Sequence, residues 1–200
     1  MKKGIRGLLI LLTLLSCNSP GNLSPANYTA YLENPEHDFC RKVVVGNNEY
    51  TIQLAPAEYM VCKETEQSDS SKRIMAARLK ELDGTIFFLI KIGATKESRI
   101  QQGGKRTSEE QINANAKVSY YDQLAVKDIS LENGEQMIYP STYVFENNYD
   151  LSPFNTIVVG FDAVTTENLK LTFNDRYTGV PAIRASFSKE QLTKLPKLTF

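Results

Sequence analysis

The apolar and polar positions in the first half of the chain predict a hairpin, a helix and a buried strand. Residues 41–55 contain a β-branched run, a Gly-Asn-Asn turn cluster and a stretch that alternates polar and apolar, as expected of a β-hairpin. Residues 57–64 are compatible with either a helical turn or a strand. Apolar residues recur at helical spacing within 69–82, which predicts a helix. The contiguous apolar residues within 85–92 predict a strand that is covered on both faces.

The second half of the chain has the pattern of a strand-rich domain. Residues 108–121 begin with a capping-box pattern and predict another helix. From residue 125 onward, turn residues separate short apolar runs, which predict strands at 126–131, 136–139, 143–146, 156–163, 168–173 and 182–187. A short helix over 188–194 and an extended piece over 197–200 follow. This order predicts an α+β, β-dominant fold, in which the N-terminal hairpin and helix precede an antiparallel β-sandwich-like or partly open barrel domain.

The first sixteen residues have the pattern of an export signal. Three basic residues precede an apolar stretch over 8–15, which is far shorter than the roughly 20 apolar residues of a membrane-spanning helix. The closing sequence Leu14-Leu15-Ser16-Cys17 resembles the lipobox of bacterial lipoproteins. The resemblance implies that Cys17 carries a diacylglyceryl group and becomes the first residue when 1–16 are removed. Several acyl chains on one residue would anchor the protein stably. The alternative is an ordinary secretory signal with a chance cysteine.

After this leader, the composition predicts a linker and then one domain. Residues 17–32 are rich in Asn, Ser and Pro, and we expect a flexible tether there. Residues 33–200 have the length of a single β-rich domain, with a small lobe over 33–122 and a sandwich-like part over 123–200 as a finer division. Among lipoproteins, Asp directly after the lipidated cysteine favours the inner membrane. Asn18 therefore implies the outer membrane, facing the periplasm, with display on the cell surface as the alternative.

Composition narrows the partners and leaves the cysteines open. Without residues 1–16, the chain has 20 Lys and Arg against 23 Asp and Glu, a net charge of −3. Because there is no basic excess, no nucleic acid is expected as a partner. Cys40 and Cys62 remain after Cys17. In an exported protein they could form a disulfide, which would stabilise the fold by roughly 3 kcal/mol, or they could be two separately buried thiols.

No motif in the sequence specifies catalysis or a cofactor. The densest group of metal-ligating residue types is Glu36, His37, Asp38 and Cys40. Its spacing matches no zinc signature, so neither a metal site nor a cofactor is expected. His37 is also the only histidine, and no Gly-x-Ser-x-Gly sequence supplies a nucleophile for it. We therefore predict no catalytic residue.

Two further patterns have structural explanations that we favour. Residues 186–189 match the Ser-x-x-Lys motif of penicillin-recognising enzymes, but that family's other motifs do not follow. Ser188 and Gln191 instead predict a capping box for the last helix. Five tyrosines could form a recognition surface or could pack into the core with their hydroxyls at its rim: Tyr120, Tyr121, Tyr139, Tyr143 and Tyr149.

Three stretches of the chain resemble uncharacterised lipoproteins of Bacteroidota. These are Asn-Pro-Glu-His at 34–37, the strand sequence Tyr-Thr-Ile-Gln-Leu at 50–54 with Pro56 after it, and the ending Lys-Leu-Pro-Lys-Leu-Thr-Phe at 194–200. The resemblance implies an outer-membrane lipoprotein. It assigns no chemistry to any of these residues.

Together these patterns favour a non-catalytic role at a membrane. We expect a protein anchored to the membrane through the lipid on Cys17, which acts as an interaction or accessory subunit beside a protein partner in a bacterial cell-envelope assembly. The alternatives are a periplasmic carboxylate-dependent hydrolase and a lipoprotein that binds a small ligand or a glycan. A flat apolar patch would favour the first role, a pocket with two facing acids the second, and an aromatic-lined concavity the third.

Overall fold

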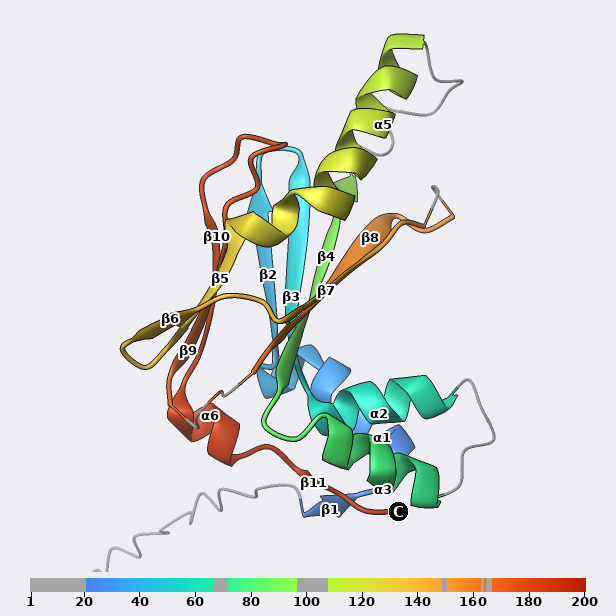
Figure 1. Cartoon of the computed structure of the whole chain (residues 1–200), viewed down its shortest axis with the longest axis vertical. Helices are drawn as coiled ribbons and strands as arrows, with labels where there is room; N and C mark the ends of the chain where they lie inside the picture. The colour runs from blue at the N-terminus through green and yellow to red at the C-terminus, as the bar shows by residue number, and fades with distance from the viewer. Residues whose placement is uncertain (1–20, 67–71, 97–107, 149–150, 163, 165–166) are drawn as a thin grey trace, which may run out of the picture.

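The structure is a computed structural model, which describes residues 21–66, 72–96, 108–148, 151–162, 164 and 167–200. It mixes helices and strands and is rich in strands (Figure 1). Two larger antiparallel sheets hold most of the strands, and these sheets are not closed into a barrel.

The larger sheet has five strands, in the order β2-β3-β4-β8-β7. Their bounds are β2 Cys40–Val45, β3 Asn48–Pro56, β4 Ile86–Ala94, β8 Phe154–Phe161 and β7 Thr142–Glu146. The contiguous apolar run forms the central strand β4, which pairs with β3 on one side and β8 on the other. The sheet therefore joins strands from both halves of the chain.

The second sheet has four strands, in the order β10-β9-β5-β6. Their bounds are β10 Ile183–Phe187, β9 Leu169–Phe173, β5 Ile129–Asn133 and β6 Gln136–Ile138. The predicted strand over 126–131 begins later than expected, because Ala125–Asp128 forms the 3-10 turn η2. In β5, β9 and β10 every second residue is buried, as expected of strands that turn one face to a core.

The core lies between the two sheets. The ring of Phe88 on β4 lies 5.7 Å from the ring of Phe187 on β10, and Tyr50 on β3 lies 6.4 Å from Phe173 on β9. The opposite face of β4 is only partly covered, since Lys91 is exposed. The prediction that both faces of this strand are covered is therefore wrong at Lys91. A long side chain can hold its charged end in water while its neighbours on the strand are buried.

The expected tether over 17–32 is also wrong from Asn22 onward. β1 (Asn22–Leu23) pairs in parallel with β11 (Lys197–Leu198), and α1 follows at Pro25–Glu33. Tyr28 and Leu32 lie one helical turn apart and are 1% and 0% exposed, so burial of this apolar pair orders a segment of polar composition. Pro25 at the start of α1 suits a first helical turn, where no backbone N–H donor is needed.

A contact between helices fixes the end of α1. α2 spans Ala57–Glu66, which makes the ambiguous stretch after β3 helical. The Glu33 carboxylate accepts a hydrogen bond of 2.8 Å from the Tyr59 hydroxyl and forms a 2.9 Å ion pair with Lys63. Partial burial would raise the pKa of Glu33, but the hydrogen bonds from Lys63 and Tyr59 outweigh it, and the pKa is lowered.

The helices gather at the two ends of the sheets (Figure 1). α1, α2, α3 (Lys72–Glu81) and α6 (Lys189–Thr193) lie at one end, together with β1, β11 and the C-terminus. α5 (Ser108–Gln123) lies at the opposite end. Within the described part of the chain, no helix is both long and apolar enough to cross a membrane.

Candidate functional site

A pocket of about 340 Å³ lies where α2, α3 and α6 meet the first residues of β4. We call it the α3–α6 pocket. Eight of the twelve described residues that line it are aliphatic, while polar atoms form nearly half of its exposed surface. The lining residues are Pro56, Ala57, Glu58, Leu79, Leu82, Asp83, Gly84, Thr85, Ile86, Val164, Leu192 and Leu195. Apolar walls with a few polar groups are typical of small-molecule sites, whose volumes run from about 300 to 1,000 Å³. This pocket is at the small end of that range.

One side of the pocket is formed by the turn from α3 into β4. α3 ends at Glu81, and the backbone N–H of Thr85 donates a 3.0 Å hydrogen bond to the carbonyl oxygen of Leu82. Gly84 has a φ of 79°, a left-handed conformation that glycine adopts without steric cost. The turn brings Leu79 and Leu82 of the helical stripe beside Ile86 at the start of the central strand.

The opposite side of the pocket is formed by α6 and the residues after it. The capping box predicted for this helix is confirmed: the Gln191 backbone N–H donates to Ser188 Oγ at 3.2 Å, and the Ser188 N–H donates to Gln191 Oε1 at 2.9 Å. Ser188 therefore serves as a helix cap. The cap starts α6 where Leu192 and then Leu195 contribute to the pocket wall.

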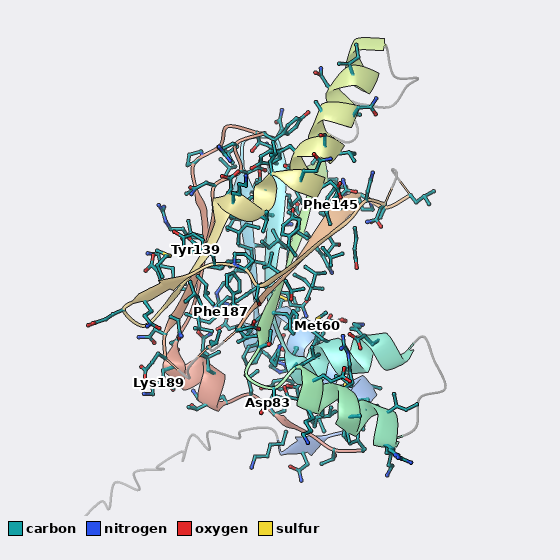
Figure 2. The ribbon with its side chains drawn as sticks, viewed as in Figure 1. Met60, Asp83, Tyr139, Phe145, Phe187 and Lys189 are labelled. Atoms are coloured by element: carbon teal, nitrogen blue, oxygen red, sulfur yellow. The ribbon has the colours of Figure 1, made fainter. Side chains whose placement is uncertain are left out.

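The polar groups of the pocket are acidic or neutral. Glu58 lies in the first turn of α2, and Asp83 lies at the end of α3, between that helix and α6 (Figure 2). The Thr85 hydroxyl donates a 2.7 Å hydrogen bond to an Asp162 carboxylate oxygen. Among the described residues that line the pocket, none is Lys, Arg or His.

A second cluster of titratable side chains lies at the other end of the sheets, around Asp175. This residue is 1% exposed. One of its carboxylate oxygens accepts 2.7 Å hydrogen bonds from the hydroxyls of Tyr50 and Tyr121, and the other accepts a 3.2 Å bond from the Thr178 backbone N–H. Burial first, and then the Asp175 carboxylate, raise the pKa of Tyr121. The phenol therefore stays protonated and donates.

A neighbouring contact extends this cluster to the surface. The Tyr120 hydroxyl donates to Asp128 at 2.7 Å, and Arg176 Nε forms a 2.8 Å ion pair with the same carboxylate. The Arg176 backbone N–H in turn donates to the Tyr120 hydroxyl at 3.1 Å. These bonds tie α5 and the loop after β9 to η2, and the Tyr50–Asp175 bond ties the same loop to β3. The hydroxyl and carboxylate groups of this cluster bind one another and nearby backbone groups, which indicates a structural role.

The five tyrosines named from the sequence differ in their exposure to solvent. Tyr120 and Tyr121 are buried, and Tyr143 is partly buried with its hydroxyl donating to the Tyr121 carbonyl oxygen, so the core explanation holds for these three. Tyr139 is 67% exposed. Tyr149 lies outside the described residues.

The residues considered for metal binding make separate contacts. His37 Nδ1 donates to the Tyr31 carbonyl oxygen at 2.8 Å, and its ring stacks on Tyr31 at 3.8 Å between ring centroids. Asp38 pairs with Arg41 at 3.1 Å. Within the described ranges, no three His, Cys, Asp or Glu side chains are grouped to hold a metal ion.

The cysteines named from the sequence lie on different elements. Cys40 begins β2 and is half-buried, whereas Cys62 is buried in α2; both are described, and no disulfide joins them. The Cys40 thiol lies 3.8 Å from the Leu32 carbonyl oxygen, and burial raises the pKa of Cys40. Cys17, the expected lipidation site, lies outside the described residues.

Sequence reasoning missed most of the pocket and the role of Asp175. Leu79 and Leu82 belong to the predicted helical stripe, but no local signal indicated that Val164, Leu192 or Leu195 would lie opposite them. Asp175 follows Asn174 in what reads as an ordinary turn. Its only sequence signal is an acidic residue next to a buried strand, which is too common to identify a burial site.

Comparisons with known proteins give no family. No protein-family model and no curated protein matches the chain. Among solved structures, the chain is similar to a DUF4426 family protein from Pseudomonas aeruginosa PAO1, with 11% sequence identity and a TM-score of 0.35 over 74% of this chain and 91% of that chain. A likeness at this TM-score supports no inference about function. The geometry therefore defines only a class: a strand-rich α+β protein with an aliphatic, acid-rimmed pocket.

Proposed function

We propose that this protein is an outer-membrane lipoprotein of the kind found in Bacteroidota, anchored through Cys17 and facing the periplasm. Its folded part is a non-catalytic, sandwich-like binding module that holds an apolar group of its ligand or envelope partner in the α3–α6 pocket. The observation that carries the proposal is the pocket itself, because its eight aliphatic side chains gain free energy when an apolar group displaces water from them. The resemblance of residues 14–17 to a lipobox supports the lipid anchor on Cys17.

The position of the pocket fits a protein that works close to a membrane. Cys17 precedes Asn22 of β1 by five residues, which span at most about 18 Å of extended chain. β1 pairs with β11, and β11 begins two residues after Leu195 of the pocket wall. A lipid on Cys17 would therefore hold the pocket end of the domain next to the bilayer, where apolar ligands are concentrated.

A carboxylate-dependent hydrolase is the second candidate, because Glu58 and Asp83 line the same pocket. Glycosidases use such a pair on either side of the bond they cleave. Binding is better supported, since most of the described lining residues are aliphatic and none of them carries an aromatic ring to stack on a sugar.

The anchor is tested by lipid labelling in the cells that make the protein. Cys17→Ala should abolish incorporation of labelled palmitate and removal of residues 1–16, because the alanine has no sulfur to acylate. Ser19→Ala, two residues further on, is the matched control and should be labelled and cleaved normally. Palmitate incorporation into the Cys17→Ala chain would refute the anchor.

Binding in the pocket is tested by methyl NMR on the full chain, held in phosphatidylcholine nanodiscs. Decanol serves as the probe, and six lining residues carry the reporting methyl groups: Leu79, Leu82, Ile86, Val164, Leu192 and Leu195. Their resonances should shift on titration and saturate. Leu79→Gln should weaken the binding of decanol about tenfold, because it puts an amide into the apolar wall.

The control for this titration lies on the same helix. Ile74 is on α3, is 57% exposed and does not line the pocket, so Ile74→Gln should leave the affinity for decanol unchanged. Methyl shifts spread evenly over the protein, or an equal loss of affinity in both variants, would show that decanol binds without using the pocket.

A further inference from the structure

The polar rim of the α3–α6 pocket has one sign of charge. Glu58, in the first turn of α2, and Asp83, just after α3, both line the pocket. The carboxylate of Asp162 accepts the hydrogen bond from the hydroxyl of Thr85, which also lines it. No described lining residue carries a positive charge. The described bases at the two ends of α6 form ion pairs: Lys189 pairs with Glu167 at 2.9 Å, and Lys194, which follows the helix, pairs with Glu190 at 2.6 Å.

The aliphatic and the acidic lining residues favour different parts of a ligand. The aliphatic walls favour a hydrocarbon chain, and a volume of about 340 Å³ suits one short chain and not a pair of chains. Carboxylates in the lining attract a positive head group and repel a negative one, and this attraction is stronger beside low-dielectric walls than in bulk water.

We infer that the α3–α6 pocket binds a single-chain amphiphile with a cationic head group. The chain of the amphiphile lies among Leu79, Leu192 and Leu195, and its head group lies at Glu58 and Asp83. This inference rests on the proposed function, since it names the ligand class of the same pocket. The proposed function requires only that the pocket binds apolar groups, so the two can fail independently.

The decisive experiment compares head groups of opposite charge on the same hydrocarbon chain. Decylamine and decanoate are titrated below their micelle-forming concentrations into the full chain in phosphatidylcholine nanodiscs, with decanol as the neutral reference and the pocket methyl groups as reporters. Decylamine should bind at least about tenfold more tightly than decanoate at low ionic strength. Raising the salt concentration should narrow this difference, because salt screens charges at a pocket mouth.

Charge-neutral variants identify the carboxylates responsible. The double variant Glu58→Gln with Asp83→Asn should bring the affinities for decylamine and decanoate to within about threefold of each other. Decanol should still bind and shift the pocket methyl groups, which shows that the pocket is still folded. Glu81→Gln is the matched control, because Glu81 is an exposed acid two residues from Asp83 that pairs with Arg78 and does not line the pocket. It should retain the full preference for decylamine.

Each outcome of these titrations decides between the two proposals. If decylamine, decanol and decanoate all leave the pocket methyl groups unshifted, the pocket binds none of them and the proposed function itself is wrong. If decanol binds but decanoate binds as tightly as decylamine, the proposed function stands and the cationic ligand is refuted. A preference for decylamine that survives the double variant would likewise refute the role of Glu58 and Asp83.

Discussion

Truncation of Phe88 tests how the two sheets pack together. Its side chain lies on the central strand β4, is 0% exposed and contacts both sheets. The ring lies 5.9 Å from Phe161 of the neighbouring strand, at an interplanar angle of 78°, and 5.7 Å from Phe187 of the opposite sheet. Phe88→Ala therefore removes a group that fills space between the sheets, and we expect it to destabilise the whole domain.

The magnitude follows from burial and from the cavity left behind. Loss of a fully buried Phe side chain costs about 1.5–3 kcal/mol in transfer free energy. Roughly 100 Å³ of removed volume would add up to about 2.4 kcal/mol at about 24 cal/mol per Å³ if the cavity did not collapse. The free energy of unfolding should thus fall by about 3–5 kcal/mol. At about 2–4 °C per kcal/mol for a chain of this size, the melting temperature should fall by roughly 6–20 °C.

The assay is urea unfolding followed by circular dichroism, with thermal melts in parallel. Lys91→Ala is the control, because Lys91 is exposed on the other face of the same strand and should change the free energy of unfolding by less than about 0.5 kcal/mol. Phe88→Leu keeps most of the volume and should lie between the two, which preserves the test if the alanine variant does not fold. Equal stability of Phe88→Ala and Lys91→Ala would refute the packing of the two sheets described above.

Three further predictions test other contacts. Tyr121→Phe removes a donor to the buried Asp175 carboxylate and should cost about 1.5–3 kcal/mol in urea unfolding; an unchanged midpoint would show that this bond contributes nothing. Gly160→Ala would place a Cβ 2.7 Å from the Phe87 ring, so thermal melts should show a loss of about 1–3 kcal/mol, and an unchanged melting temperature would mean that the ring moves freely. The lowered pKa of Glu33 stabilises the fold above its unfolded-state pKa of about 4.3, and this contribution disappears as the pH falls through the folded-state pKa. Glu33→Gln should therefore lose less than about 1 kcal/mol at neutral pH and converge with the parent in acid, whereas a constant difference at every pH would contradict this account.

Local signals in the sequence were sufficient for several elements. The contiguous apolar run predicted β4, helical spacing predicted α3, and the pair Ser188 and Gln191 predicted the cap of α6. Each of these signals acts over a few residues, through side-chain periodicity or through a hydrogen bond between near neighbours. Such signals can be read from a few neighbouring residues, so the sequence alone was sufficient to predict these elements.

The tertiary structure decided the rest, because it depends on which apolar surfaces are buried together. α1 forms where the composition predicted a tether, since Tyr28 and Leu32 are buried in the core. The α3–α6 pocket exists only because residues 79–86 and 192–195 meet at one end of the sheets. The burial of Asp175 likewise requires donors from β3 and α5, which are distant in sequence. No local pattern predicts these contacts between distant segments, because the favourable free energy of burial arises only when the segments exclude water from one another.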